Sequence, residues 1–167
     1  MLKTFLAVAL FSGIALTAKS QQVVDLTENE SYKINGLEYG YYISNESNKS
    51  VKGEDYDRYE VILYVNNNSG CVKIMPFRNS IISSSSDETM LADFTVKNAT
   101  GKRLTSKSGK VNAKPFYCYV KLGDGTKVNA QAGYAVKNGE SITNKIIVIV
   151  EKGQRPKVNC RTVYIQE

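Results

Sequence analysis

Apolar and polar residues alternate with a period of two along most of the chain after residue 20. The alternation is clearest at 59–65, 92–97, 116–120 and 128–136. Successive side chains of an extended strand point to opposite faces, so each segment predicts a half-buried β-strand. Residues 146–150 are apolar at every position, which is typical of a central strand. No segment after residue 20 shows the 3.6-residue periodicity of apolar positions that an amphipathic helix has.

Turn-forming residues separate these alternating segments. Asparagine and glycine, which tolerate positive φ at hairpin tips, occur together at 35–36, 67–70, 98–101 and 138–139, and 123–125 reads Gly-Asp-Gly. Several short strands at this spacing predict an all-β fold, an antiparallel sandwich of the immunoglobulin-like type. A small β-barrel is the alternative.

The first twenty residues have the pattern of a cleaved signal peptide. Lys3 gives a positive start, and residues 5–18 form an uncharged and mainly apolar run. That run is shorter than the roughly 20 residues that a membrane-spanning helix needs. Small residues at Ala18 and Ser20 predict cleavage before Gln21. A buried first helix is the alternative, and a lipid anchor is not expected because no cysteine follows the apolar run.

Removal of residues 1–20 leaves 147 of the 167 residues, which is enough chain for one domain at 21–167. No stretch within this range is apolar enough to span a membrane as a helix. The sequence therefore predicts a single domain exported to the periplasm or the cell exterior, with no transmembrane segment.

Charge is distributed unevenly along the predicted mature chain. Residues 21–60 contain nine acids and four bases, whereas residues 61–167 contain seven acids and sixteen bases. No acid occurs at 94–123, where the candidate binding residues are Lys102, Arg103, Lys107 and Lys110. Such asymmetry can attract an anionic partner, which outside the cell is a glycan, a lipid head group or an acidic protein rather than nucleic acid. Solvated strand faces and hairpin tips are the alternative explanation.

Tyrosine is the enriched aromatic residue, with eleven copies and no tryptophan in the chain. Tyr39, Tyr41 and Tyr42 begin a cluster of six tyrosines. Phenol rings on one sheet face can form a binding surface for sugars or proteins, although the lack of tryptophan is against a sugar site. The alternative is that tyrosine is frequent here because it favours β-strands.

Common catalytic and metal-binding motifs are absent from the sequence. The chain has no histidine, which excludes Ser-His-Asp and Cys-His catalysis in their usual forms. It has neither a phosphate-binding loop nor a CxxC motif, so no cofactor is predicted. Glu54, Asp55 and Asp57 form a weak Ca²⁺ candidate that lacks the glycine and distal glutamate of an EF-hand loop. A solvated loop is the alternative.

Three cysteines allow at most one disulfide within the chain. Cys118 alternates with Phe116 and Val120 and is predicted to be a free thiol in the core. Cys71 and Cys160 have polar neighbours, and we expect a Cys71–Cys160 disulfide in the oxidising compartment outside the cell.

Three segments resemble small exported β-sandwich proteins of Bacteroidota-type bacteria that have no assigned activity. They are 32–42, which reads YKINGLEYGYY, 59–65, which reads YEVILYV, and 128–135, which reads VNAQAGYA. The resemblance covers most of the predicted mature chain. It implies a fold and a compartment, but it transfers no functional residue.

Together these observations predict an exported binding or envelope-accessory domain that is not an enzyme. Its expected partner is an anionic envelope component or another envelope protein. The alternative function is a hydrolase that uses carboxylates alone on glycans, because two acids held roughly 5–10 Å apart across a cleft are enough for that chemistry.

Overall fold

The computed structural model describes residues 22–76, 89–101 and 109–162. These parts of the chain contain eleven strands and every pairing is antiparallel. The strands are β1 (Val23–Leu26), β2 (Ser31–Ile34), β3 (Leu37–Val51), β4 (Glu54–Asn67), β5 (Lys73–Pro76), β6 (Met90–Lys97), β7 (Gly109–Asn112), β8 (Lys114–Lys121), β9 (Lys127–Val136), β10 (Ser141–Glu151) and β11 (Lys157–Thr162).

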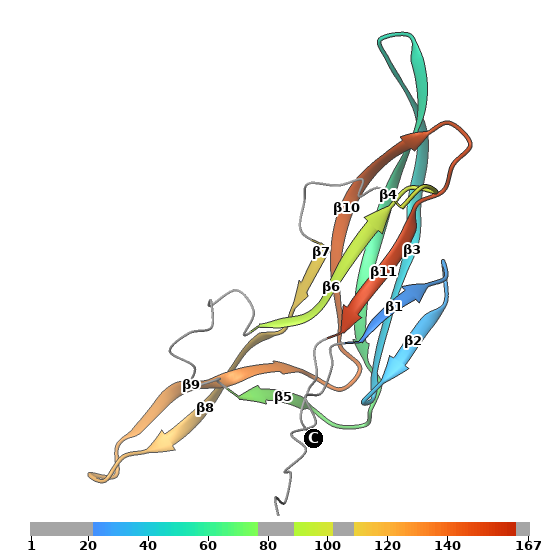
Figure 1. The fold of residues 1–167 in the computed structure, drawn as a ribbon. Helices are drawn as coiled ribbons and strands as arrows, with labels where there is room; N and C mark the ends of the chain where they lie inside the picture. Colours follow the sequence, from blue (N-terminus) through green and yellow to red (C-terminus); the bar gives the residue numbers. More distant parts are fainter. Residues whose placement is uncertain (1–21, 77–88, 102–108, 163–167) are drawn as a thin grey trace, which may run out of the picture.

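The strands form three sheets, two of which face each other as a sandwich (Figure 1). Sheet A has the order β1-β11-β6-β7, and sheet B has the order β10-β4-β3-β2. The sheets are not closed into a barrel, so the predicted antiparallel β-sandwich is confirmed over its alternative.

The core of the sandwich lies between sheets A and B. Sheet B contributes alternate residues of β3, β4 and β10, and sheet A contributes alternate residues of β6 and β11. The largest buried side chains include Tyr39, Tyr59, Leu63, Phe94 and Ile146, none of which is more than 2% exposed. Along β4 every second residue is buried, which is the alternation that the sequence shows at 59–65.

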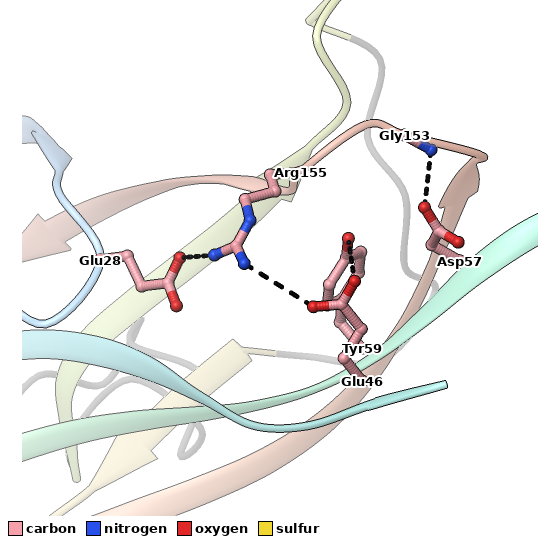
Figure 2. A network of polar contacts seen from close by, with 6 residues as sticks. All are labelled: Glu28, Glu46, Asp57, Tyr59, Gly153 and Arg155. Carbon is pink, nitrogen blue, oxygen red and sulfur yellow. Dashed lines mark hydrogen bonds and ion pairs between the residues drawn. The ribbon is translucent and has the colours of Figure 1, made fainter. Parts of the chain in front are cut away.

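A network of polar contacts closes one end of the sandwich (Figure 2). Arg155, in the loop between β10 and β11, pairs with Glu28 at 2.5 Å and with Glu46 of β3 at 3.7 Å. The hydroxyl of Tyr59 donates a hydrogen bond to Glu46 at 3.2 Å. The buried carboxylate of Asp57 accepts the backbone N–H of Gly153 at 2.6 Å. The network therefore joins the β10–β11 connection to the base of the β3–β4 hairpin, which continues past the sandwich (Figure 1).

Sheet C has the order β5-β9-β8, and its base packs into the sandwich core through Met75 of β5 and Val136 of β9. The β8–β9 hairpin extends away from the sandwich, and we call this hairpin the arm (Figure 1). In the described structure β5 pairs with residues 133–136 of β9, so the outer part of the arm has two described strands. The sequence predicted these segments as ordinary strands of the sandwich; instead they form a third sheet, and its outer part projects away from the sandwich (Figure 1).

Asn67 connects the base of the arm to the sandwich. Its side chain is fully buried at the end of β4, and its Nδ2 donates to the carbonyls of Cys71 and Val136, each at 2.8 Å. Its Oδ1 accepts the N–H of Ser69 at 3.1 Å and the hydroxyl of Ser69 at 2.7 Å. One side chain thus holds β4, the loop leading to β5, and the last residue of β9.

Candidate binding surface

The tip of the arm is a tight turn that fixes the pairing of its two strands. The N–H of Gly125 donates to the carbonyl of Leu122 at 2.9 Å, and the N–H of Leu122 donates to the carbonyl of Thr126 at 2.8 Å. Gly125 has a φ of +86°, a conformation that glycine adopts without steric cost. The carboxylate of Asp124 accepts the N–H of Thr126 at 2.9 Å, and this hydrogen bond lowers the pKa of Asp124.

The register of the two strands gives the arm two different faces. Directly opposed residues of an antiparallel pair lie on the same face of a sheet. Tyr117, Tyr119 and Lys121 stand opposite Gln131, Asn129 and Lys127, and these six residues form what we call the aromatic–basic face. Cys118 and Val120 stand opposite Ala130 and Val128 on the other face, which is apolar.

The aromatic–basic face is strongly exposed. Tyr119 is 78% exposed and Tyr117 is 54% exposed. Both fractions are higher than that of Tyr42 in the sandwich, which is 41% exposed. Tyr119, Lys121 and Lys127 line a surface pocket of about 440 Å³. The face consists of two tyrosines, two lysines and two residues with side-chain amides. None of these six residues is acidic.

The apolar face of the arm is also open to solvent. Val120 is 42% exposed, Val128 is 36% exposed, and every side chain of β8 is exposed or half-buried. An apolar face that no described element covers is uncommon in a folded domain and marks a surface that contacts another molecule. The arm is therefore the strongest candidate binding surface in the described part of the chain.

The predicted basic cluster is represented by one residue in the structure. Lys102, Arg103 and Lys107 lie outside the described residues. Lys110 is half-buried on β7, and its backbone carbonyl accepts the side-chain amide of Asn144 at 2.9 Å. The structure thus joins β7 to β10 at Lys110.

The predicted tyrosine surface on β3 is wrong for two of its three residues. Tyr39 is 1% exposed and Tyr41 is 5% exposed, because both face the core of the sandwich. Burial raises the pKa of both phenols. Tyr42 points the other way and is 41% exposed, with its ring centroid 6.3 Å from that of Tyr64. Alternation along β3 separates Tyr41 from Tyr42, so the three rings cannot share one surface.

The predicted Ca²⁺ ligands have separate partners. Glu54 accepts the hydroxyl of Tyr56 at 2.5 Å, Asp55 pairs with Lys152 at 3.0 Å, and Asp57 accepts the N–H of Gly153. They are successive or alternate residues of β4, so they do not surround a common point. Within 22–76, 89–101 and 109–162, no three acidic or cysteine side chains come together as metal ligands.

The predicted disulfide is absent, and the core thiol is a different cysteine. All three cysteines are free. Cys160 is fully buried on β11, whereas Cys71 is exposed in the loop after β4, where its sulfur lies 3.3 Å from the hydroxyl of Ser69. Cys118, predicted as the core thiol, is half-buried on the arm. Burial raises the pKa of Cys160 to about 12, and the nearby charge of Asp93 adds to this effect.

Comparison with known proteins gives no relative for this chain: no protein-family model, curated protein or solved structure matches it. Among the described residues, no helix is both long enough and apolar enough to cross a membrane.

Sequence reasoning missed Tyr117, Tyr119 and Lys127 as surface residues. The alternation at 116–120 identified the strand and its apolar side, but it does not show whether anything covers that side. A usable signal was present, because two tyrosines spaced by two residues occur between Lys114 and Lys121. Tyrosines at every second position of a strand, on the face opposite its apolar residues and flanked by lysines, are candidates for an exposed contact surface.

Proposed function

We propose that this chain is an exported, non-enzymatic binding domain whose aromatic–basic face contacts an anionic glycan of the cell envelope. The pocket lined by Tyr119, Lys121 and Lys127 is the observation that supports this proposal most directly. It combines a highly exposed ring with two cations on a projecting arm that is accessible to a large ligand.

The chemistry of the face suits a sugar polymer with acidic groups. Phenol rings offer flat apolar area for the faces of sugar rings, and the amides of Asn129 and Gln131 can bond to hydroxyl groups. The ammonium groups of Lys121 and Lys127 can pair with carboxylates of the polymer. A neutral glycan would leave both cations unpaired, so the proposal requires a charged one.

The test is binding to a polyuronate such as alginate, with uncharged dextran as the comparison polymer. We expect alginate to bind and dextran not to bind at 0.1 M salt. Binding should be lost at 1 M salt, because the Debye length falls from about 10 Å to about 3 Å. Titration calorimetry at both salt concentrations measures this difference.

Variants locate the contact on the arm. The double change Lys121→Glu and Lys127→Glu should weaken alginate binding by at least about tenfold, equivalent to roughly 1.4 kcal/mol. The matched control reverses two exposed lysines elsewhere, Lys49→Glu and Lys157→Glu, and should leave affinity within about twofold. Equal loss in both variants would contradict a site on the arm. Release of new reducing ends from alginate would instead support the hydrolase.

A further inference from the structure

The outer edge of β8, on the arm, pairs with no other strand of the described structure. β8 is the last strand of sheet C in the described structure, and its partner β9 lies on its other side only. An unpaired edge presents a row of N–H and carbonyl groups that can pair with another chain. Natural proteins protect such edges with proline or lysine, and β8 has these residues near its ends, at Lys114, Pro115 and Lys121. The middle of the strand has no such protection.

The hydrogen bond at the turn determines which residues present this edge. Because the N–H of Leu122 points toward Thr126 of the hairpin, backbone groups of Val120 and Cys118 also point toward β9. The intervening residues, Tyr117 and Tyr119, must then direct their N–H and carbonyl groups outward. Pro115 belongs to the same outward set, and it has no N–H to leave unpaired.

We propose that two copies of this chain associate by antiparallel pairing of their β8 edges, with Cys118 on the two-fold axis. In this register Tyr117 of one copy stands opposite Tyr119 of the other, and Phe116 stands opposite Val120. The tyrosine pairs are the hydrogen-bonded positions, so all four outward groups of each central strand segment find partners. The result is one sheet with the order β9-β8-β8-β9 across the two copies.

Charge favours this register and a second copy as the occupant. Lys121 of each copy stands opposite Pro115, which is uncharged, and the two Lys121 residues are six positions apart, or roughly 20 Å. A register centred on Tyr119 would bring them to four positions apart, or roughly 13 Å. Lys114, at the other end of the strand, is already neutralised by Glu140 at 2.5 Å.

The instability of the isolated outer arm gives a physical reason for the pairing. A lone two-stranded ribbon is only marginally stable in water, whereas a four-stranded sheet with a hydrophobic face has enough strands to be stable. Pairing also places Phe116, Cys118 and Val120 of the two copies side by side, which reduces the exposure of the apolar face. The proposal is independent of glycan binding, because it uses the strand edge rather than the aromatic–basic face.

The register predicts a specific cross-link. Cys118 and its copy would be a non-hydrogen-bonded pair, in which Cα atoms lie about 4.5 Å apart, within the range of a disulfide. With oxidised glutathione as oxidant, one Cys118 thiolate attacks the glutathione disulfide and releases one glutathione thiolate. The second Cys118 thiolate then attacks the Cys118 sulfur of the mixed disulfide and releases the other. One disulfide is reduced, one is formed, and the two protein thiols lose two protons.

The cross-linking experiment uses the full chain with Cys71→Ser, which removes the exposed thiol of the loop. We expect oxidised glutathione to convert most of this variant into a dimer linked through Cys118, identified by mass spectrometry. The matched control adds Cys118→Ser and Val120→Cys, which moves the thiol two positions along the strand. Its two thiols would be about four positions, or roughly 13 Å, apart and should cross-link at least tenfold more slowly. Equal rates would overturn the register.

A second pair of variants tests the edge without a thiol. Tyr119→Pro removes an outward N–H and no bond to β9, whereas Tyr119→Ala removes the same ring and keeps the N–H. Sedimentation velocity without glycan should show a concentration-dependent dimer for the parent and for Tyr119→Ala, and a monomer for Tyr119→Pro with an unchanged circular dichroism spectrum. A parent that stays monomeric up to millimolar concentration would overturn the proposal, and its failure would leave alginate binding by the monomer as a separate result.

Discussion

β4 in the sandwich and β8 in the arm are both alternating strands, and they differ in what lies against their apolar side. On β4, Val61 and Leu63 are fully buried because sheet A covers them. On β8, Cys118 is half-buried and Val120 is 42% exposed because no second sheet of the described structure faces them. The same sequence pattern therefore yields core in one region and surface in the other. What differs is the position of the strand in the topology.

The comparison shows where the stability of this fold resides. Buried apolar area contributes about 25 cal/mol per Å², so strands covered on one face by another sheet contribute far more than the outer arm. The arm is ordered at its base, where Gly133, Ala135 and Val136 of β9 are buried. Among the described residues, its outer part is held by the turn and by cross-strand pairs, which leaves its side chains available for contacts with other molecules.

The largest expected effect is a contrast between two leucines. Leu63→Ala removes a fully buried side chain from the core and should cost about 2–5 kcal/mol of unfolding free energy. Leu122→Ala makes the same change at the tip of the arm, where the side chain is 46% exposed, and should cost less than about 0.5 kcal/mol. Urea denaturation followed by circular dichroism measures both. Similar losses would show that the arm is packed as tightly as the core.

The sandwich itself could be predicted because its signals are local. Alternation at 59–65 and 92–97 identified β4 and β6, and Asn-Gly pairs identified turns at 35–36 and 138–139, where Gly36 and Gly139 adopt positive φ. Gly70 has a positive φ as predicted, but the hairpin tip predicted at 67–70 is wrong, because β4 and β5 belong to different sheets. Asn67 is buried at this point, and the chain continues from it into sheet C. This path depends on the hydrogen bond from Asn67 to Val136, a residue far along the sequence.

The candidate site could not be predicted because the exposure of its residues depends on whether another layer packs over their strand face. Tyr39 and Tyr119 are both strand tyrosines, but one is 1% exposed and the other is 78% exposed. Similarly, Cys118 lies between apolar residues of its own face and was predicted to be buried, whereas the thiol that the described structure encloses between two sheets is Cys160. Periodicity assigns a residue to a face, whereas coverage of that face is set by long-range packing.

The next effect concerns the joint between the two regions. Asn67→Ala leaves the carbonyls of Cys71 and Val136 without their amide donor, and we expect a cost of about 2–4 kcal/mol. Hydrogen exchange at residues 133–136 should accelerate as well, because the base of the arm loses its link to β4. The control is Asn48→Ala on the exposed part of β3, which should cost less than about 0.5 kcal/mol. Unchanged exchange at 133–136 in Asn67→Ala would contradict the role of Asn67 as the joint.

The smallest expected effect is a loss of stability at alkaline pH caused by the buried thiol of the sandwich. Burial raises the pKa of Cys160 to about 12, against an ordinary value of 9.0. The folded protein therefore keeps a proton that the unfolded chain releases, so stability is full below pH 9 and falls as the pH rises toward 12. The loss at pH 10 should be on the order of 1 kcal/mol from this group. The buried phenol of Tyr39, whose pKa is also raised, adds to the loss above pH 10.

Urea denaturation at pH 7, 8, 9 and 10 isolates the contribution of the thiol. Cys160→Ala removes the group, so its stability should fall less steeply between pH 8 and pH 10 than that of the parent. Val158→Ala is the matched control, because Val158 is buried on the same strand and the same face and does not titrate. It should lower stability by a similar amount at every pH and keep the slope of the parent. An identical slope in all three proteins would mean that Cys160 titrates alike in the folded and unfolded chains, and the thiol would then have to be in contact with water rather than enclosed between sheets A and B.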